Sequence, residues 1–374
     1  MSPQSDREED FRHATRQEFV GSPVGESMEV LSQKRRDSTD MGAPTTGANP
    51  RHWAGLGRIL WFFGIIVVLA FAMNALINAG LRRIRTSNFG VSNQVMEGRV
   101  NAEIVISGSS RALYHYDTRS IQEITRCTTF NVGLNGSHTD MQLAFLKAYL
   151  DHNAKPKLVI QNLDLFCFEP LPEIYDPAQY MPYLDEDPIY HGVLRYYPDA
   201  WKWKYLPLYD YLVQDMRFQW LLGLRALVGW QPKEDRFQGF IPRHSSWTDD
   251  FERFQRRYPN GTQFEIEPQG VRDLKELAEV CRQRRIPLLF VYSPEYVDMQ
   301  ALERNRSEIF ALFRQICERY QAPLWDFSDS PISKDRANFY NSQHLNAEGA
   351  RAFSEDLAHR LVASGLLPAK PASQ

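Results

Sequence analysis

One run of the chain limits how everything else can be organised. From Ile59 to Ala79 the sequence ILWFFGIIVVLAFAMNALINA contains no charged side chain, and only Asn74 and Asn78 carry amide side chains. At a rise of ~1.5 Å per residue, a helix of this length measures about 31 Å, which matches the hydrocarbon core of a bilayer. A buried helix of a soluble protein is rarely apolar on all faces for so long. We predict one transmembrane anchor, residues 56–82.

Basic residues flank this anchor on both sides. Lys34, Arg35, Arg36, Arg51 and Arg58 precede it, and Arg82, Arg83 and Arg85 follow it. The two sides are nearly balanced, and the arginines nearest the helix favour a cytoplasmic C-terminal part.

The first 55 residues have a different composition. Residues 1–55 contain nine acidic and seven basic side chains but only three aromatic ones: Phe11, Phe19 and Trp53. Such a segment buries too little apolar surface to offset the entropy of ordering, so it is predicted to be a disordered tail. A binding peptide around Phe11 to Phe19 is the alternative.

Charge and cysteine usage exclude several function classes. With 43 Lys and Arg against 46 Asp and Glu, the chain lacks the basic excess that nucleic-acid binding requires, so nucleic acid is not an expected partner. The four cysteines, at positions 127, 167, 281 and 317, form no CxxC pair, which predicts buried thiols rather than a zinc site. No Walker loop and no GxGxxG after a strand are present, so no cofactor and no metal are expected.

Residues 90–370 are predicted to form the working domain. Short apolar runs alternate with amphipathic helical runs, a pattern typical of a parallel α/β sheet. The expected strands are 103–107, 128–132, 157–163, 287–292 and 323–327, and the expected helices are 142–150, 271–284, 301–320 and 346–363. This order predicts a flavodoxin-like three-layer sandwich around a parallel five-stranded sheet, with ligands beyond the carboxyl ends of the strands.

An aromatic-rich insertion interrupts this pattern at residues 171–254. It holds 19 aromatic side chains in 84 residues. These rings would either line a groove for sugar rings or form the core of a lid subdomain. The apolar stretch from Trp220 to Trp230 contains Arg225 and is too short to span a bilayer, so it is expected to pack inside the protein or to lie at the membrane interface.

Polar residues that suit catalysis follow three of the strands. Gly108, Ser109 and Ser110 stand where the first strand turns into a helix, whose free N–H groups can stabilise an anion; a serine there also serves as a helix cap. Gly133 follows the second strand and permits close approach of its backbone N–H. Asn162 and Asp164 follow the third.

A late histidine completes this set. His344 stands shortly before the last predicted helix, where it can fold back over the first-strand serine and accept its proton. A histidine considered alone is more often structural. The combination of serine, glycine, Asn or Asp and histidine on one sheet edge favours a catalytic site.

At these residues the sequence resembles the SGNH/GDSL hydrolase superfamily, in particular its membrane-anchored envelope members, which include proteins of lipoteichoic acid D-alanylation and alginate O-acetylation. The resemblance covers roughly residues 100–165 and 270–365. It implies that Ser110 is the nucleophile, that Gly133 donates to the oxyanion, that Asp164 or Asn162 occupies the third block, and that His344 is the base. It also implies a C-terminal domain outside the cytoplasm, which we follow here over the arginine count.

The sequence departs from the superfamily pattern at Asn341, which takes the place of the triad Asp. An Asn oxygen can accept the imidazole N–H but brings no charge, and in a serine triad the Asp-to-Asn change cost ~10⁴ in turnover through the wrong histidine tautomer. Three outcomes remain: a Ser-His dyad, an acid borrowed from Asp329 or Asp335, or an inactive site.

These observations lead to two functional hypotheses. The first is a membrane-anchored serine esterase or O-acyltransferase that acts on a carbohydrate or glycolipid acyl ester of the cell envelope, together with a membrane-bound acyl-transfer partner. The second is a non-catalytic binding or assembly component that keeps the same fold.

Overall fold

The computed structural model describes residues 50–213 and 217–367. Most of the predicted tail, residues 1–49, lies outside the described residues. The chain divides into two compact units, Met1–Ile66 and Val67–Gln374, and the second contains the sheet. Helix α2 (Pro50–Leu81) contains one stretch, Gly55–Leu81, that is long and apolar enough to cross a bilayer.

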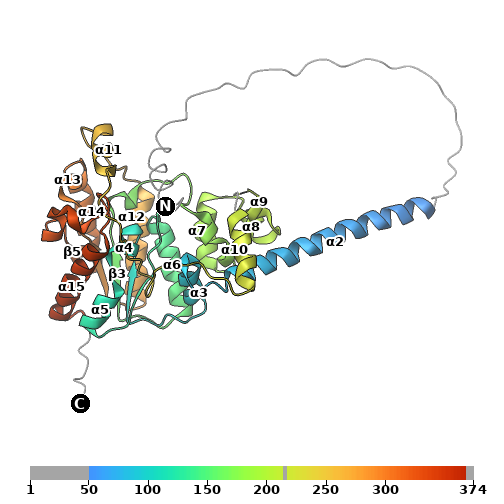
Figure 1. Ribbon diagram of the computed structural model, residues 1–374, viewed down its shortest axis with the longest axis horizontal. Coiled ribbons are helices and arrows are strands. Elements are labelled where there is room, and N and C mark those ends of the chain that lie inside the picture. Colours follow the sequence, from blue (N-terminus) through green and yellow to red (C-terminus); the bar gives the residue numbers. More distant parts are fainter. Residues whose placement is uncertain (1–49, 214–216, 368–374) are drawn as a thin grey trace, which may run out of the picture. The chain divides into compact units, whose positions relative to one another are not determined.

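The second unit is built on a parallel five-stranded sheet (Figure 1). Its strands are β1 (Ile104–Ser107), β2 (Thr129–Asn131), β3 (Leu158–Asn162), β4 (Leu288–Tyr292) and β5 (Leu324–Asp326). They are arranged in the order β2-β1-β3-β4-β5, and every neighbouring pair is parallel. This arrangement confirms the predicted α/β fold class, and each strand lies inside the segment expected for it.

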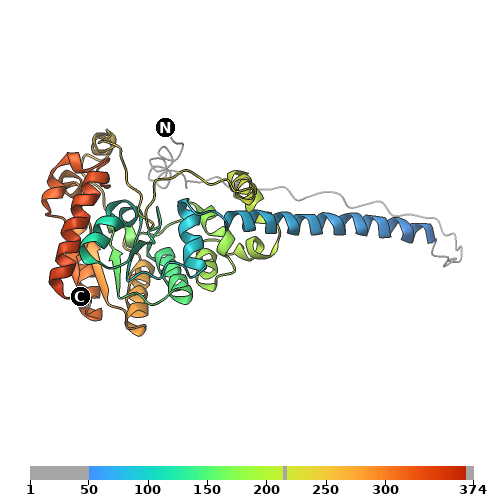
Figure 2. The ribbon, with the colours of Figure 1, turned by 60° about the horizontal axis from the view of Figure 1, so that its bottom comes forward.

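Helices cover both faces of this sheet, as Figure 2 shows from a second direction. The helices that follow α2 in the described chain are α3 (Ser87–Met96), α4 (Ser110–His115), α5 (Thr118–Thr125), α6 (Thr139–His152), α7 (Asp187–Tyr196), α8 (Ala200–Tyr205), α9 (Tyr209–Val213), α10 (Arg217–Leu227), α11 (Asp250–Arg257), α12 (Pro268–Gln283), α13 (Val297–Gln300), α14 (Arg306–Tyr320) and α15 (Ala347–Ser364). Short 3₁₀ turns lie at Leu165–Phe168, Pro177–Gln179, Met181–Tyr183, Pro331–Lys334 and Arg336–Asn338.

The two-residue period of the strands divides the core into two layers. Ile104 and Ile106 of β1 pack with α4, α5 and α15, whereas Val105 packs on the opposite face with α6 and α12. The same alternation holds along β3 and β4. Because successive strand residues point to opposite faces, each buried strand supplies both cores, and this explains its uninterrupted apolar sequence.

Several aromatic side chains of the insertion belong to the main core of the domain. Tyr180, Tyr183, Trp203 and Tyr211 are buried and belong to the same hydrophobic cluster as α6 and α12. For these four residues the core interpretation holds.

One segment of the insertion, residues 237–248, runs along the carboxyl edge of the sheet. The carbonyl of Gln238 accepts from the N–H of Asn131 at 2.8 Å, and the carbonyl of Arg243 accepts from the N–H of Ala347 at 2.8 Å. Thr248 donates to the carbonyl of Tyr340 at 3.1 Å. The segment therefore ties the end of β2 to the chain that precedes α15, and we call it the edge segment.

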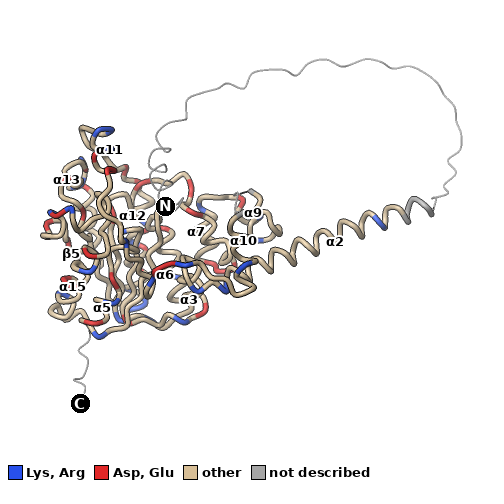
Figure 3. The backbone as a smooth tube through the Cα atoms, viewed as in Figure 1, with Lys and Arg blue, Asp and Glu red and all other residues tan. Residues whose placement is uncertain are grey.

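Acidic and basic residues are interspersed along the described chain (Figure 3). The exception is α2, where Arg58 is the single charge between Gly55 and Leu81.

Candidate active site

Ser110 owes its position to a sharp turn at the end of β1. Gly108 follows the strand with φ of 148°, a conformation that favours glycine, and a Cβ there would lie 2.8 Å from Cβ of both Ala112 and Asn162. Ser109 is the N-cap of α4 and Ser110 is its first residue. The turn therefore presents Ser110 at the carboxyl edge, and its backbone N–H has no acceptor within the helix because the first four N–H groups of a helix never have one.

His344 lies in a tight loop that leads into α15. The backbone N–H of Tyr340 donates to the carbonyl of His344 at 3.1 Å, and Phe339 forms an isolated bridge with Leu345. Asn346 then caps α15, because its side chain accepts from the N–H of Gly349. These bonds fix the loop on both sides of the histidine.

The fold brings Ser110 and His344, 234 residues apart, into hydrogen-bond contact. The Oγ atom of Ser110 lies 2.7 Å from Nε2 of His344, and Nδ1 of His344 lies 3.0 Å from Oδ1 of Asn341. Ser110, His344 and Asn341 thus form a continuous hydrogen-bonded chain of the kind that activates a serine hydroxyl. Asp335 accepts from the N–H of Ala337 and caps a 3₁₀ turn. The residue that contacts Nδ1 of His344 is Asn341.

The hydrogen bonds of Asn341 determine which histidine tautomer is present. Its Oδ1 atom accepts from the backbone N–H of Gln343 at 3.1 Å and of His344 at 2.8 Å. Because a backbone N–H can only donate, this atom must be the amide oxygen, and Nδ1 of His344 must carry the proton that it shares with it. Nε2 is therefore the acceptor facing the Ser110 hydroxyl, which is the tautomer that a general base requires.

Aromatic side chains hold the ring of His344 in place. Tyr340 stacks on it with centroids 5.5 Å apart and an interplanar angle of 11°, and Tyr114 meets it edge-on at 5.7 Å. Arg243 of the edge segment lies over the Tyr114 ring at 4.2 Å and donates to the Tyr114 hydroxyl at 2.6 Å. The insertion thus contributes to the surroundings of the histidine.

His115 is a functional candidate that the sequence reasoning missed. It is fully buried at the end of α4, 6.1 Å from His344 between ring centroids. Its Nε2 accepts from the N–H of Leu345 at 3.1 Å, so Nδ1 carries the proton and donates to the Ser293 hydroxyl at 2.9 Å. Burial, and after it the charge of Arg111, lowers the pKa of His115 well below its usual value. A neutral His115 therefore anchors the residue next to His344.

The expected oxyanion donors bond elsewhere. The N–H of Gly133 donates to the side-chain oxygen of Asn131 at 2.9 Å. The Asn162 amide is buried, accepts from the Tyr116 hydroxyl at 2.8 Å and directs its Nδ2 toward Asp164 at 3.3 Å. Asp164 itself is an ion-pair partner of Arg111 at 3.5 Å, and an ionised carboxylate cannot donate.

Arg111 and Asp164 belong to a buried charged cluster below this edge. The guanidinium of Arg111 lies 4.2 Å from the ring centroid of Tyr292, whose hydroxyl is 2.5 Å from Glu295. Arg306 pairs with Glu295 at 3.5 Å and with Glu303 at 2.6 Å. Burial, and after it the charge of Glu295, raises the pKa of Glu303 to about 9. Burial therefore opposes the ionisation of Glu303, and the neighbouring Arg306 favours it.

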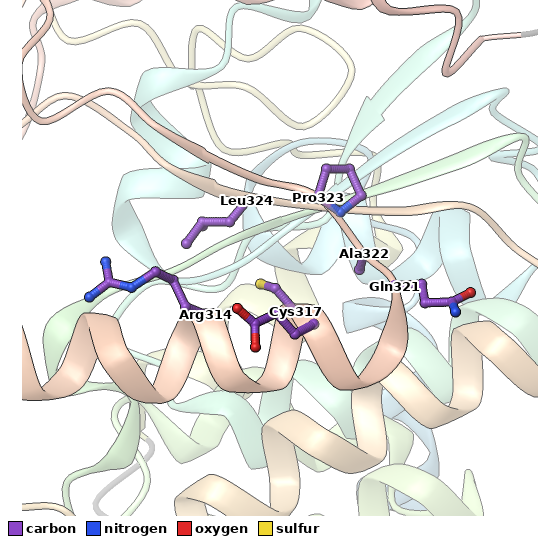
Figure 4. A pocket seen from close by; sticks show the side chains of 7 residues that line it. Arg314, Cys317, Gln321, Ala322, Pro323 and Leu324 are labelled. Atoms are coloured by element: carbon purple, nitrogen blue, oxygen red, sulfur yellow. The ribbon is translucent and has the colours of Figure 1, made fainter.

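Two cavities of the described residues lie in different parts of the domain. One of about 430 Å³ is lined by Arg314, Cys317, Glu318, Gln321, Ala322, Pro323 and Leu324, where β5 begins (Figure 4). The other, of about 270 Å³, is lined by Ser246, Trp247, Arg336, Ala337, Phe339 and Asn346. Because Phe339 and Asn346 bracket the His344 loop, the second cavity borders the candidate site and the first does not.

No family model matches the chain, and no curated protein matches it. Solved structures that it matches include a putative acylhydrolase from Bacteroides fragilis, with 9% identity, a TM-score of 0.32 and coverage of 70% of this chain and 87% of the other. A putative lipolytic protein of the G-D-S-L family from Desulfitobacterium hafniense matches with 12% identity, a TM-score of 0.33 and coverage of 68% and 97%. An acetyl xylan esterase matches with 10% identity, a TM-score of 0.34 and coverage of 70% and 98%.

Proposed function

We propose that this chain is a membrane-anchored serine esterase or O-acyltransferase of the SGNH type, whose substrate is an acyl ester on a cell-envelope carbohydrate or glycolipid. The observation that carries the proposal is the hydrogen-bonded series from Ser110 Oγ through His344 to Asn341. In this series the unprotonated Nε2 of His344 faces the hydroxyl of Ser110 at the start of α4. A general base requires this arrangement, whereas a histidine with a structural role does not.

The reaction follows from this geometry. Ser110 Oγ attacks the acyl carbonyl carbon while its proton passes to Nε2 of His344, and the backbone N–H of Ser110 donates to the oxygen that becomes negative. His344 returns the proton to the departing alcohol, which leaves an acyl ester on Ser110. Water or a sugar hydroxyl then loses a proton to Nε2 and attacks that ester, and Ser110 regains its proton.

Labelling with a fluorophosphonate probe tests the nucleophile. The full chain in detergent micelles should react covalently at Ser110, and Ser110→Ala should abolish labelling. Ser109→Ala is the matched control: this neighbouring hydroxyl is fully buried and has no hydrogen-bond partner in the part of the chain that the structure describes. Equal labelling of the wild type and Ser110→Ala would refute the assignment.

One observation favours the second candidate, a non-catalytic binding or assembly component. The N–H of Gly133 is already bonded to Asn131, so it is not free to act as the second oxyanion donor in this conformation. If wild-type protein fails to react with the probe while remaining folded, as judged by its circular dichroism, the binding function replaces the enzymatic one.

A further inference from the structure

The last turns of α2 are packed against the aromatic insertion through one face. Residues 74, 77, 78 and 81 follow the i, i+3, i+4, i+7 spacing of a single helix face, and Ile77 and Leu81 are buried. The two amides of the apolar run both bond to the insertion. Asn74 accepts from the N–H of Leu208 at 3.1 Å, and Asn78 accepts from the hydroxyl of Tyr211 at 2.7 Å.

Two glycines let α2 and α10 meet backbone to backbone. A Cβ added to Gly223 would lie 2.6 Å from the carbonyl oxygen of Ile77, and one added to Gly80 would overlap the carbonyl of Gly223. Small residues at a crossing of this kind are typical of helices that associate within or beside a membrane. The helices α9 and α10 are therefore attached to the end of the anchor itself.

The exposed apolar side chains of the sheet-containing unit gather at this place. Outside α2, the described residues include eleven large hydrophobic side chains that are exposed, and nine of them fall between residues 201 and 230. Those nine are Trp201, Tyr205, Leu206, Leu212, Phe218, Trp220, Leu221, Val228 and Trp230, and we call them the collar. Val228 is 85% exposed, Leu212 80% and Phe218 77%, so they belong to no core formed by the described residues.

The position of the collar along α2 matches the surface of a bilayer. Because α9 and α10 contact the helix from Asn74 onward, lipid can surround it only before that residue. The stretch from Gly55 to Met73 has one charge, Arg58, and at ~1.5 Å per residue measures about 28 Å, close to the thickness of the hydrocarbon core. The bilayer surface then crosses α2 near Asn74, at the level of the collar.

The residues of the collar also suit this level. Trp and Tyr concentrate where membrane meets water, and lysines extend their ammonium groups toward the headgroups. Lys202 lies 5.8 Å from the Trp201 ring centroid, and Lys204 lies 5.8 Å from that of Tyr205.

We propose that the collar inserts its apolar side chains into the bilayer interface around the end of α2, so that the domain rests on the membrane rather than hanging from a single helix. This inference rests on the membrane anchoring contained in the proposed function. Lipid is favoured over a protein occupant because the collar belongs to the helices that contact α2 from Asn74 onward, next to the apolar residues that precede Asn74 on the same helix.

Spin labels at single introduced cysteines test the proposal. The four native cysteines are buried and remain in place, with the wild-type chain as the labelling blank. The full chain would be reconstituted into vesicles of phosphatidylcholine and phosphatidylglycerol and labelled in the variants Val228→Cys, Leu212→Cys and Val362→Cys. Val362 is the matched control, an exposed valine on α15 outside the collar. Collision with oxygen is compared with collision with a water-soluble nickel chelate.

We expect labels at 228 and 212 to collide at least threefold more with oxygen, relative to nickel, than the label at 362 does. Ratios equal to that of 362 would overturn the proposal, and so would protection from both reagents, which indicates a protein partner or a second copy on the collar. A fourth variant, Leu69→Cys, separates this result from a failure of the anchor. If 69 is in lipid while 228 and 212 are in water, only the collar fails; if 69 is in water, the anchor fails as well.

Discussion

Replacing Asn341 by Ala and by Asp separates two contributions to the activity of His344. Ala removes the oxygen that accepts three N–H groups, from Gln343, His344 and the imidazole Nδ1. The histidine then loses the bond that keeps the proton on Nδ1, and a ring with its proton on Nε2 cannot take one from Ser110. Because general-base assistance contributes ~10²–10⁴-fold and a wrong tautomer in a serine triad ~10⁴-fold, we expect Asn341→Ala to lose at least about 100-fold in kcat.

Asn341→Asp keeps the oxygen and adds a charge. With Oδ1 3.0 Å from Nδ1, the centres of the carboxylate and the imidazolium would lie ~4 Å apart, where the attraction is between about 1 kcal/mol in water and about 4 kcal/mol at an effective dielectric constant of ~20. Both side chains are half-buried, so the lower part of this range applies. A gain of ~1.4 kcal/mol in the transition state corresponds to about 10-fold in kcat.

The assay is the hydrolysis of p-nitrophenyl acetate by the full chain in detergent micelles, together with the rate of fluorophosphonate labelling. Glu348→Gln is the control, since this exposed side chain bonds only to Arg351 among the interactions described. ¹⁵N chemical shifts of His344 report its tautomer directly. Wild-type activity in Asn341→Ala would refute the tautomer argument, and an unchanged or lower rate in Asn341→Asp would refute the charge argument.

Three further substitutions probe the supports of the site. His115→Phe removes the acceptor of the Leu345 N–H and should lower kcat about 10- to 100-fold at constant KM, with partial rescue by His115→Gln; a KM effect without a kcat effect would contradict the positioning role. Gly108→Ala places a Cβ 2.8 Å from two neighbouring Cβ atoms at φ of 148°, so we expect the free energy of unfolding to fall by ~1–3 kcal/mol and the labelling of Ser110 to slow. Thermal unfolding measures the loss of stability, and an unchanged melting temperature would contradict it. Glu303→Gln removes a carboxyl whose pKa of about 9 in the folded protein exceeds its ordinary 4.5, so the free energy of unfolding of the wild type should fall as pH rises between these values, by up to about 1.4 kcal/mol per pH unit from this group. The variant should therefore gain stability relative to the wild type from pH 6 to pH 8. Melting temperatures that change equally with pH in the two proteins would exclude the pKa shift.

The sheet could be predicted because its signal is local. β1, β3 and β4 are mainly apolar runs that are buried along their whole length, and the alternating helices leave little choice of topology. Ser110 and His344 could be paired for the same reason, because parallel strands end at one edge and both residues were expected there.

The rest depends on contacts that a local pattern does not encode. His115 lies in a six-residue helix, and its partners Ser293 and Leu345 are 178 and 230 residues away. The hydrogen bond from the Gly133 N–H to the Asn131 side chain could have been predicted, since an Asn commonly accepts from the backbone N–H two residues later. In the insertion, the dense aromatic residues hide the helical period, so neither its short helices nor their packing on α2 could be read from the sequence.

The edge segment has a consequence for the choice of substrate. It belongs to the same insertion as the collar and bonds directly to the end of β2 and to the His344 loop, so the scissile bond would be met at a constant height above the lipid. An enzyme with this arrangement would select its substrates by the distance between the ester and the membrane. Esters carried on headgroups too short to rise to Ser110, or on chains held too far out, would escape it, and lengthening the tether between ester and membrane should give a rate that rises to an optimum and then declines.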